Sequence, residues 1–227
     1  IDVRLVGSEM CIRDRFNVEP ELPDGLNFTN GTIFGIPTVN SSLVQYNITA
    51  INNGGSDYFL LNITILEPVA ILDVETNYFE LTRSETEMNL TLNNTGGMVA
   101  TWQVYPELPD GLIFGNGTIT GVPTVNSSLA TYEIFANNTG GSASILINIK
   151  ILEPAANISY RTTQFTLTNG QDILKVSPVL LGGNPDTWEF EPELPDGIIF
   201  SNGVFSGLPA ENLSTTTYTV WANNSGG

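Results

Sequence analysis

The stretch PELPDGLIFGNGTITGVPTVNSS, residues 106–128, decides the fold because the chain contains three versions of it. PELPDGLNFTNGTIFGIPTVNSS begins at Pro20 and PELPDGIIFSNGVFSGLPAENLS begins at Pro192, so the period is 86 residues both times. Internal repeats of fixed period are the signature of arrays of one structural unit. A unit of this length matches a small all-β sandwich and is too long for most solenoid repeats.

The second repeat carries strand and turn patterns throughout. Residues 145–151 alternate isoleucines with other residues at period two, which predicts a half-buried strand. Asn116-Gly117 predicts a tight hairpin, and residues 108–111, Leu-Pro-Asp-Gly, predict a type I turn with Gly at the fourth position. No segment has an extended helical period. We therefore predict an all-β fold of immunoglobulin/cadherin-like Greek-key β-sandwiches with about seven strands per repeat.

The repeat register predicts the domain boundaries. We expect an N-terminally incomplete repeat at 16–68, a complete repeat at 69–154, and a third repeat at 155–227 that lacks its last strand. Residues 1–15, IDVRLVGSEMCIRDR, do not fit this register and hold the only cysteine, Cys11. We interpret them as translated sequencing-adaptor sequence, to be set aside in fold reasoning; a genuine divergent strand is the alternative. The chain is then expected to be a window from a longer protein.

Two aromatic residues favour the immunoglobulin-type sandwich in particular. Trp102 falls on the third predicted strand, where that fold places its core tryptophan. Tyr132 precedes Ile134 by two residues, the spacing of a tyrosine corner to the position that antibody domains give to a cysteine. Core packing is the main interpretation of these rings, and a stacking platform for sugars is the alternative.

Several separated motifs with matching spacing resemble one family. The string L-P-x-G-L-x-F, followed by N-G-T-I-x-G-x-P-T and Y-x-I-x-A-x-N-x-G-G, resembles the immunoglobulin-like domains of bacterial and archaeal surface proteins, which are also described as cadherin-like and dystroglycan-related. The resemblance covers the chain from Phe16 onward. It implies a tandem extracellular β-sandwich used in adhesion, in surface layers or as a spacer in secreted enzymes.

Composition excludes several classes of function. The chain has 24 acidic and 7 basic residues, no histidine and a net charge of −17. Nucleic-acid binding needs clustered Lys and Arg to neutralise phosphates, so it is not expected. No apolar run is long enough to span a bilayer, so no membrane insertion is expected in this fragment. One cysteine and no histidine also exclude ordinary His/Cys zinc sites and Ser-His-Asp or Cys-His catalysis.

Acidic residues at the loops near the linkers suggest a calcium site. Loops of a seven-strand sandwich alternate between its two ends, so the PELPDG turn and the exit of the last strand should meet at one end. Oxygen ligands on loops are what Ca²⁺ prefers. Against this, the acidic D-x-N-D linker signature of calcium-dependent cadherins is absent, and Asp is common in such turns for conformational reasons alone. The candidate calcium ligands are Glu21, Asp24, Glu67, Glu107, Asp110 and Glu153.

Carboxylate catalysis is not expected. Paired carboxylates perform glycoside hydrolysis, but here the same acidic motif recurs in every copy, which suits a structural role. The Gly-Gly pairs lie in turns without a following helix, so they do not form a phosphate-binding loop. We predict no enzyme activity, no catalytic residues and no cofactor other than this calcium.

Acceptor motifs for N-glycosylation, Asn-x-Ser/Thr, recur along the chain. Some fall on the outward phase of predicted strands or in turns, where a bulky glycan fits. The alternative is that Asn, Ser and Thr simply suit turns and exposed strand faces. The candidates are Asn47, Asn62, Asn116, Asn126 and Asn137.

The linkers complete the functional prediction. The repeats are joined by the short proline-containing segments ILEPVAIL and ILEPAANI, which should hold neighbouring repeats with limited swing. The sequence therefore predicts a non-catalytic adhesive or structural spacer of a secreted or cell-surface protein. The alternative is an accessory stalk or carbohydrate-binding module of a secreted hydrolase. The partner would be a surface protein or a polysaccharide, and the location extracellular.

Overall fold

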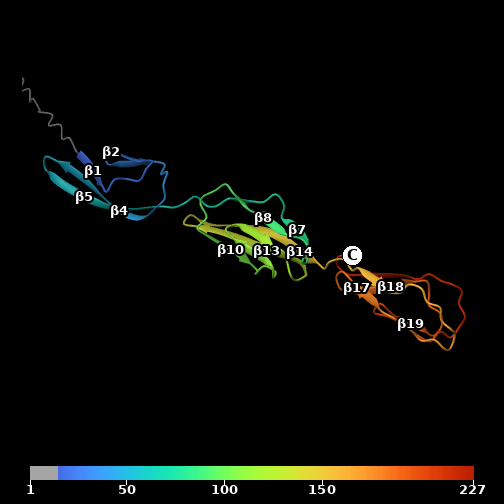
Figure 1. Ribbon diagram of the computed structural model, residues 1–227. Coiled ribbons are helices and arrows are strands. Elements are labelled where there is room, and N and C mark those ends of the chain that lie inside the picture. Colours follow the sequence, from blue (N-terminus) through green and yellow to red (C-terminus); the bar gives the residue numbers. More distant parts are fainter. Residues whose placement is uncertain (1–14) are drawn as a thin grey trace, which may run out of the picture. The chain divides into compact units, whose positions relative to one another are not determined.

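A computed structural model describes residues 15–227, which form strands and loops without a helix (Figure 1). The predicted all-β class is confirmed. The interpretation of residues 1–15 as adaptor sequence falls outside the described residues except for Arg15, which begins a strand. Between residues 15 and 227 there is no helix that could cross a bilayer.

The described chain divides into two compact units. The first contains residues 15–71 together with 94–101 and 137–143, and the second contains residues 72–93, 102–136 and 144–227. The loops 94–101 and 137–143 thus pack with the first repeat and its linker. The domain boundaries read from the repeat register stay a prediction.

The second repeat folds as two main β-sheets and one short strand pair. One sheet has the order β11-β12-β8 and the other the order β10-β13-β14-β7, while two very short strands, β6 and β9, pair with each other. The strands are β6 Leu72–Asp73, β7 Tyr78–Thr82, β8 Met88–Thr91, β9 Asn93–Asn94, β10 Thr101–Tyr105, β11 Leu112–Gly115, β12 Thr118–Gly121, β13 Ser127–Asn138 and β14 Gly141–Leu152.

The seven longer strands of this repeat follow a Greek-key path. The chain changes sheets after β7, β8, β10 and β12. β7 lies parallel to β14, with Tyr78 opposite Asn148 and Thr82 opposite Leu152. Parallel neighbours cannot be joined by a hairpin, so this pair brings together the first and last long strands of the repeat. The predicted Ig-like sandwich of about seven strands is confirmed.

The core of the second repeat consists of inward side chains from both sheets. Ile147 and Ile149 on β14 and Ile119 on β12 are all 0% exposed, and they pack in one cluster with Leu81 and Met88. Fully burying such a side chain stabilises the fold by about 1.5–3 kcal/mol relative to leaving it exposed. The isoleucines that recur at period two in residues 145–151 therefore form the core face of β14.

The Asn-Gly hairpin is as predicted. Asn116 and Gly117 both have positive φ, 50° and 75°, as a two-residue type I′ turn requires. Leu112–Gly115 and Thr118–Gly121 pair antiparallel on either side of it. The corresponding hairpins of the other two repeats also have positive φ at the asparagine and the glycine.

The predicted type I turn at residues 108–111 is wrong by one position. The Leu112 N–H donates to the Pro109 carbonyl at 3.1 Å, so the turn spans residues 109–112. Gly111 then occupies its third position with φ 92°, which suits type II and which a residue with a Cβ adopts only with strain. The same hydrogen bond occurs at Pro23 and Pro195. The peptide bonds preceding the first proline of each motif are cis: Glu19-Pro20, Tyr105-Pro106 and Glu191-Pro192.

The first repeat has fewer strands than the second. Its strands are β1 Arg15–Glu19, β2 Leu26–Thr29, β3 Thr32–Gly35, β4 Ser41–Asn52 and β5 Gly55–Ile65. They form one sheet of order β1-β4-β5 and the separate hairpin β2-β3. Tyr46, on β4, is the buried counterpart of Tyr132.

The third repeat packs around aromatic rings. Its three sheets pair β15 with β17, β16 with β20 and β19, and β18 with β21. The ring of Phe200 lies 4.9 Å from that of Phe190 and 4.6 Å from that of Phe205, between centroids. The strands are β15 Ile158–Tyr160, β16 Leu174–Val176, β17 Pro178–Leu180, β18 Thr187–Glu191, β19 Ile198–Ser201, β20 Val204–Gly207 and β21 Thr219–Asn223.

Candidate functional site

The acids predicted as calcium ligands do not converge in the described part of the chain. Within residues 15–227, no three or more His, Cys, Asp or Glu side chains form a group that could hold a metal ion. Glu21 and Asp24 line one open hollow of the first unit, but Glu67 does not. Glu107 and Asp110 are exposed to solvent. Calcium binding by these loops stays a prediction, and the geometry lends it no formed site.

Both glutamates at the ends of the last strands have protein partners. Nε and Nη2 of Arg83 donate to Oε2 of Glu153 at 3.0 and 2.6 Å, and the two side chains are 30% and 18% exposed. In the first repeat, Asn40 Nδ2 donates to Glu67 Oε1 at 2.8 Å. Two of the six positions expected to bind a cation, Glu153 and Glu67, are thus already engaged by an arginine and an amide.

A second ion pair joins β7 to β14. Lys150 Nζ lies 3.1 Å from Glu80 Oε2, and the Tyr78 hydroxyl donates to the same oxygen at 3.1 Å. The hydrogen bonds from Lys150 and then from Tyr78, with the positive charge of Lys150, hold the pKa of Glu80 below its usual value. The hydrogen bond to Glu80 raises the pKa of Tyr78. These contacts support the parallel strand pair at its exposed face.

A polar network surrounds the linker after the second repeat, and we call it joint 2. Asn224 Nδ2 donates to the carbonyl oxygens of Pro154 and Asn184 at 2.8 and 3.2 Å, while its Oδ1 accepts the Gly226 N–H at 2.9 Å. An amide side chain can donate and accept at once, so one residue ties together three segments. Joint 2 comprises residues 153–155, Gly182, Gly183, Asn184, Asn224, Ser225 and Gly226.

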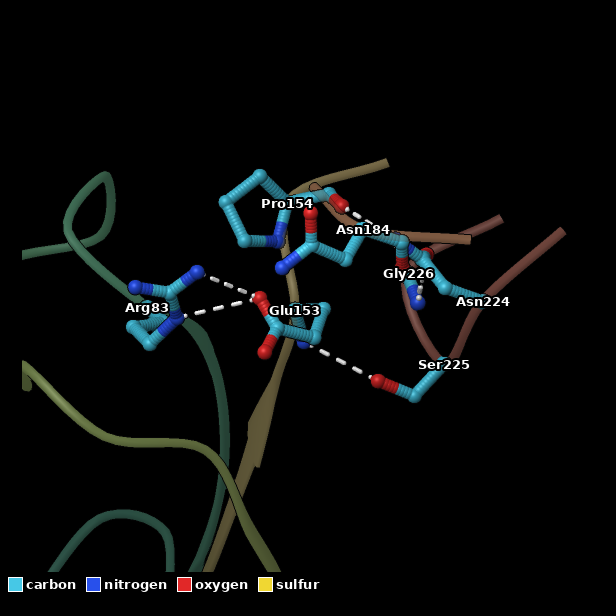
Figure 2. A network of polar contacts seen from close by, with 7 residues as sticks. All are labelled: Arg83, Glu153, Pro154, Asn184, Asn224, Ser225 and Gly226. Carbon is cyan, nitrogen blue, oxygen red and sulfur yellow. Dashed lines mark hydrogen bonds and ion pairs between the residues drawn. The ribbon is translucent and has the colours of Figure 1, made fainter. Parts of the chain in front are cut away.

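A side-chain hydroxyl group also binds this linker. The Glu153 N–H donates to Ser225 Oγ at 3.0 Å. Figure 2 shows the linker held between Arg83 on one side and Asn224 with Ser225 on the other. The consecutive residues Glu153 and Pro154 therefore have their outward backbone groups satisfied by the same short loop.

The linker after the first repeat is held in the same way, and we call this joint 1. Asn138 Nδ2 donates to the carbonyl oxygens of Pro68 and Met98 at 2.7 and 3.1 Å. The Glu67 N–H donates to Thr139 Oγ1 at 3.0 Å. Every partner lies 86 residues before its counterpart in joint 2. Joint 1 comprises residues 67–69, Gly96, Gly97, Met98, Asn138, Thr139 and Gly140.

Glycines in the joints allow the backbone of the loop to touch the backbone of the linker. A Cβ added at Gly97 would overlap the Pro68 carbonyl oxygen, and one at Gly140 would overlap the Glu67 carbonyl oxygen. Gly183 and Gly226 are equally close to the linker of joint 2. Here glycine is required for close approach of two chain segments rather than for a special φ.

Parts of joints 1 and 2 were recognised in the sequence, but the contacts between them were not predicted. The Glu-Pro pairs and the Gly-Gly turns recur at the 86-residue period, but they were interpreted as a linker and as ordinary turns. The signal that could have joined them is that Gly96-Gly97 recurs as Gly182-Gly183 together with Asn-Thr/Ser-Gly-Gly. Glycine pairs in two separate loops of one unit indicate a close backbone approach.

We expect Arg83→Gln to lower the free energy of unfolding of the second repeat by about 1 kcal/mol, because it removes a partly exposed charged hydrogen-bond pair. Hydrogen exchange of amides in β7 and β14 measures the change. The matched control is Lys150→Gln. Its ion pair with Glu80 is more exposed, so its loss should change the exchange less. Equal effects of both variants would contradict this ranking.

The glycan candidates differ in accessibility. Asn47, Asn62, Asn116 and Asn126 are exposed, whereas Asn137 is half-buried. The sequon threonine of Asn137 is Thr139, whose hydroxyl is engaged in joint 1.

On secretion from a eukaryotic host we therefore expect glycans at Asn47 and Asn62 and none at Asn137. Peptide mass spectrometry after enzymatic deglycosylation in ¹⁸O-water identifies the modified asparagines. Thr49→Ala removes the sequon of Asn47 and should abolish that glycan alone. Modification of Asn137 at the level of Asn47 would overturn this expectation.

Trp102 and Tyr132, which the sequence predicts to be core residues, are both packed within the second repeat. Trp102 is half-buried on β10 and stands edge-on to Phe114, with 6.3 Å between ring centroids. Tyr132 is buried, and this burial raises the pKa of its hydroxyl. The burial of Tyr132 and the packing of Trp102 against Phe114 favour the core interpretation of both rings.

A different aromatic residue is exposed in the third repeat. Trp221 is 43% exposed and lies opposite Glu189 in the pairing of β18 with β21. It lines a hollow together with Phe190, Glu191 and Asn223. A ring flanked by carboxylates and an amide is able to stack on a ligand and accept its hydroxyl hydrogen bonds.

No family model matches the sequence, and no curated protein matches it either. Among solved structures, the chain is similar to an I-band fragment of titin, with 14% identity over 93% of this chain and 83% of that chain and a TM-score of 0.44. It is also similar to immunoglobulin domains 1–5 of Sidekick-1, with 15% identity, coverage of 93% and 49%, and a TM-score of 0.40. An endo-fucoidan hydrolase of glycoside hydrolase family 107 has 12% identity, coverage of 87% and 34%, and a TM-score of 0.32. At these identities and TM-scores, the likenesses carry no functional argument for this chain.

Proposed function

We propose that this chain is a non-catalytic region of tandem Ig-like repeats in a secreted or cell-surface protein, where it serves as a semi-rigid structural or adhesive spacer. The observation that carries this proposal is the equivalence of joints 1 and 2. Each fixes a Glu-Pro linker through an asparagine amide, a hydroxyl and closely packed glycines. The repeats run from 16 to 68, from 69 to 154 and from 155 to 227.

The physical basis is restriction of the linker torsions. Proline already fixes one backbone torsion at Pro68 and Pro154. The hydrogen bonds to the Pro68 and Pro154 carbonyls and to the preceding N–H groups then oppose rotation of the neighbouring bonds. A Gly/Ser linker without such contacts would behave as a flexible coil.

Composition supports an extracellular spacer rather than an enzyme. The charge of −17 disfavours association between repeats in solution. The family resemblance of the three PELPDG motifs supports a location outside the cell. The glutamate and aspartate of the PELPDG motif recur in all three copies, as expected for a structural element.

Spin-label distances test whether joint 2 is stiff. In a Cys11→Ser background, cysteines replace the exposed residues Asn126 and Ser201, one in the second and one in the third repeat. Pulsed electron paramagnetic resonance of the full chain should give a narrow distance distribution, which Asn224→Ala broadens. A distribution equally broad with and without Asn224→Ala would refute the spacer mechanism.

The Trp221 hollow favours a second candidate function, an accessory carbohydrate-binding role. It predicts that the chain co-sediments with an insoluble polysaccharide and that Trp221→Ala abolishes this. Tyr105→Ala is the control, because Tyr105 is exposed at the second repeat's counterpart of Glu191. Binding that persists in Trp221→Ala, or no binding at all, would rule out this role for the hollow.

A further inference from the structure

The outer face of the third repeat carries a combination of residues that the other two repeats lack. Trp221 on β21 is 43% exposed and lies directly opposite Glu189 on β18 in the antiparallel register. Glu191 stands two residues further along β18, on the same face because side chains alternate along a strand. These three residues line the Trp221 hollow together with Phe190 and Asn223.

The hollow lies on a face that the fold itself turns outward. β18 corresponds to β10, which is an edge strand of its sheet in the second repeat. Phe135, the counterpart of Trp221, is only half-buried there, although β13 pairs with a strand on both of its sides. The side chain at this position therefore faces outward in a repeat that has both neighbouring strands in place.

The other repeats show that the sandwich does not require these residues. The residues at the positions of the two glutamates and the tryptophan are Gln103, Tyr105 and Phe135 in the second repeat and Asn17, Glu19 and Thr49 in the first. The acids of the PELPDG motif, by contrast, recur in all three copies. The combination of two acids with an indole occurs in the third repeat alone, which favours a ligand rather than the common fold as its reason.

The two carboxylates of the hollow lack a cationic partner in the described part of the chain. Among residues 15–227, the ion pairs formed by side chains both lie in the second repeat. Glu189 and Glu191 stand roughly 6.5–7 Å apart along one strand, so their like charges repel each other. A bound cation would relieve this repulsion.

The indole strengthens the preference for a cation. A cation over the face of a tryptophan ring, within about 6 Å of its centre, is attracted by the electrons of the ring. Residues directly opposite each other in an antiparallel pair have their Cβ atoms about 4.5–5.5 Å apart. One ammonium group can therefore reach both the Trp221 ring and the Glu189 carboxylate.

An amino sugar matches all the groups of the hollow. Its C–H face stacks on an aromatic ring, its ammonium group donates to carboxylates, and its hydroxyl groups bond to the Asn223 amide. A lysine side chain offers the ammonium group but neither the flat C–H face nor the hydroxyl groups. A polysaccharide of uronic acids or sulfated sugars would be repelled by both glutamates and by the net charge of −17.

We propose that the Trp221 hollow binds the protonated amino sugars of a cationic polysaccharide. Trp221 stacks on a sugar ring, Glu189 and Glu191 accept hydrogen bonds from ammonium groups, and Asn223 orients the ring through its hydroxyl groups. This inference rests on the carbohydrate-binding function proposed above and specifies its ligand class. The spacer function does not depend on it.

A matched pair of oligosaccharides tests this assignment on the full chain. The probe is a hexamer of glucosamine at mildly acidic pH, where its amines are protonated, and the control is the same hexamer with every amine acetylated. We expect saturable binding of the probe in isothermal titration calorimetry, and at least tenfold weaker binding of the control because charged hydrogen bonds are lost. Of the indole N–H signals of the three tryptophans, only that of Trp221 should shift.

Two double variants separate the hollow from the overall negative charge. Glu189→Gln with Glu191→Gln should weaken binding of the probe at least tenfold, and glutamine suits the fold there because the second repeat has Gln103. The matched control is Glu85→Gln with Glu87→Gln, which removes the same charge from two exposed acids of the second repeat at the same spacing. The control should change the affinity by less than twofold, because exposed charges far from the ligand are screened.

Four outcomes would overturn the assignment. Equal weakening by both double variants would mean that the probe is attracted by the net charge alone. Equal affinity for both hexamers would show that the hollow does not select an amine. Binding of a lysine hexapeptide as tightly as the probe, lost in Trp221→Ala, would identify a basic polypeptide as the partner. Binding of neither hexamer would also overturn it, whereas co-sedimentation with a neutral polysaccharide, lost in Trp221→Ala, would show that the carbohydrate-binding function itself stands.

Discussion

Replacing Ile149 by alanine is expected to lower the free energy of unfolding of the second repeat by about 2–5 kcal/mol. Ile149 is 0% exposed at the centre of β14, so its removal leaves a cavity between the two sheets as well as losing buried apolar surface. Ile63→Ala deletes the same side chain at the corresponding position of the first repeat. It should cost clearly less there, because Ile63 is only partly buried.

The comparison requires a local measurement. Repeats that unfold separately do not give one two-state transition, so a single melting temperature would not assign the loss to one repeat. Hydrogen exchange of amides in β13 and β14, and in β4 and β5 for the control, reports each repeat by itself. Equal losses at Ile149 and Ile63 would contradict the expectation that the loss follows the burial of each side chain.

The second large effect is expected from Gly226→Ala in joint 2. The added Cβ would overlap the Glu153 carbonyl oxygen, which is backbone and cannot rotate away. Such overpacking typically costs about 1–3 kcal/mol, and the joint can avoid the clash only by opening. We expect loss of protection at the Glu153 amide and a broadened distance distribution between labels in the second and third repeats.

The matched control for this variant lies in the first repeat. Gly54 occupies the corresponding position, but an added Cβ there meets only the Asn52 side chain, at 3.3 Å. Gly54→Ala should therefore leave exchange and label distances unaltered. A similar disturbance by both alanines would mean that the effect comes from the turn itself and not from the linker.

Local patterns in the sequence were sufficient to predict the strands and the core. The alternation at Ile147 and Ile149 and the third-strand position of Trp102 depend on neighbouring residues along the chain, so the fold class and strand number could be predicted. The turn at residue 109 was misplaced by one position because Pro suits either of two turn positions, and only the positive φ of Gly111 separates them.

The functional contacts were less accessible to prediction because they join distant segments. Glu153 meets Arg83 across 70 residues and Ser225 across 72. The Gly-Gly pair that follows Asn224-Ser225 was predicted only to lie in a turn, and Glu153 only to bind a cation. Which of these partners an acid finds depends on strand pairing in three dimensions, and no spacing in the sequence specifies it.

The joints also bear on how such an array can grow. In each of them the linker is gripped through main-chain atoms, the N–H of one residue and the carbonyl of the next. Hydrogen bonds to main-chain atoms do not depend on which side chains the preceding copy has at these positions. Duplicating a segment of 86 residues would therefore create a new, fully formed joint without any compensating substitution, so chain length can change by whole repeats while every neighbour still fits.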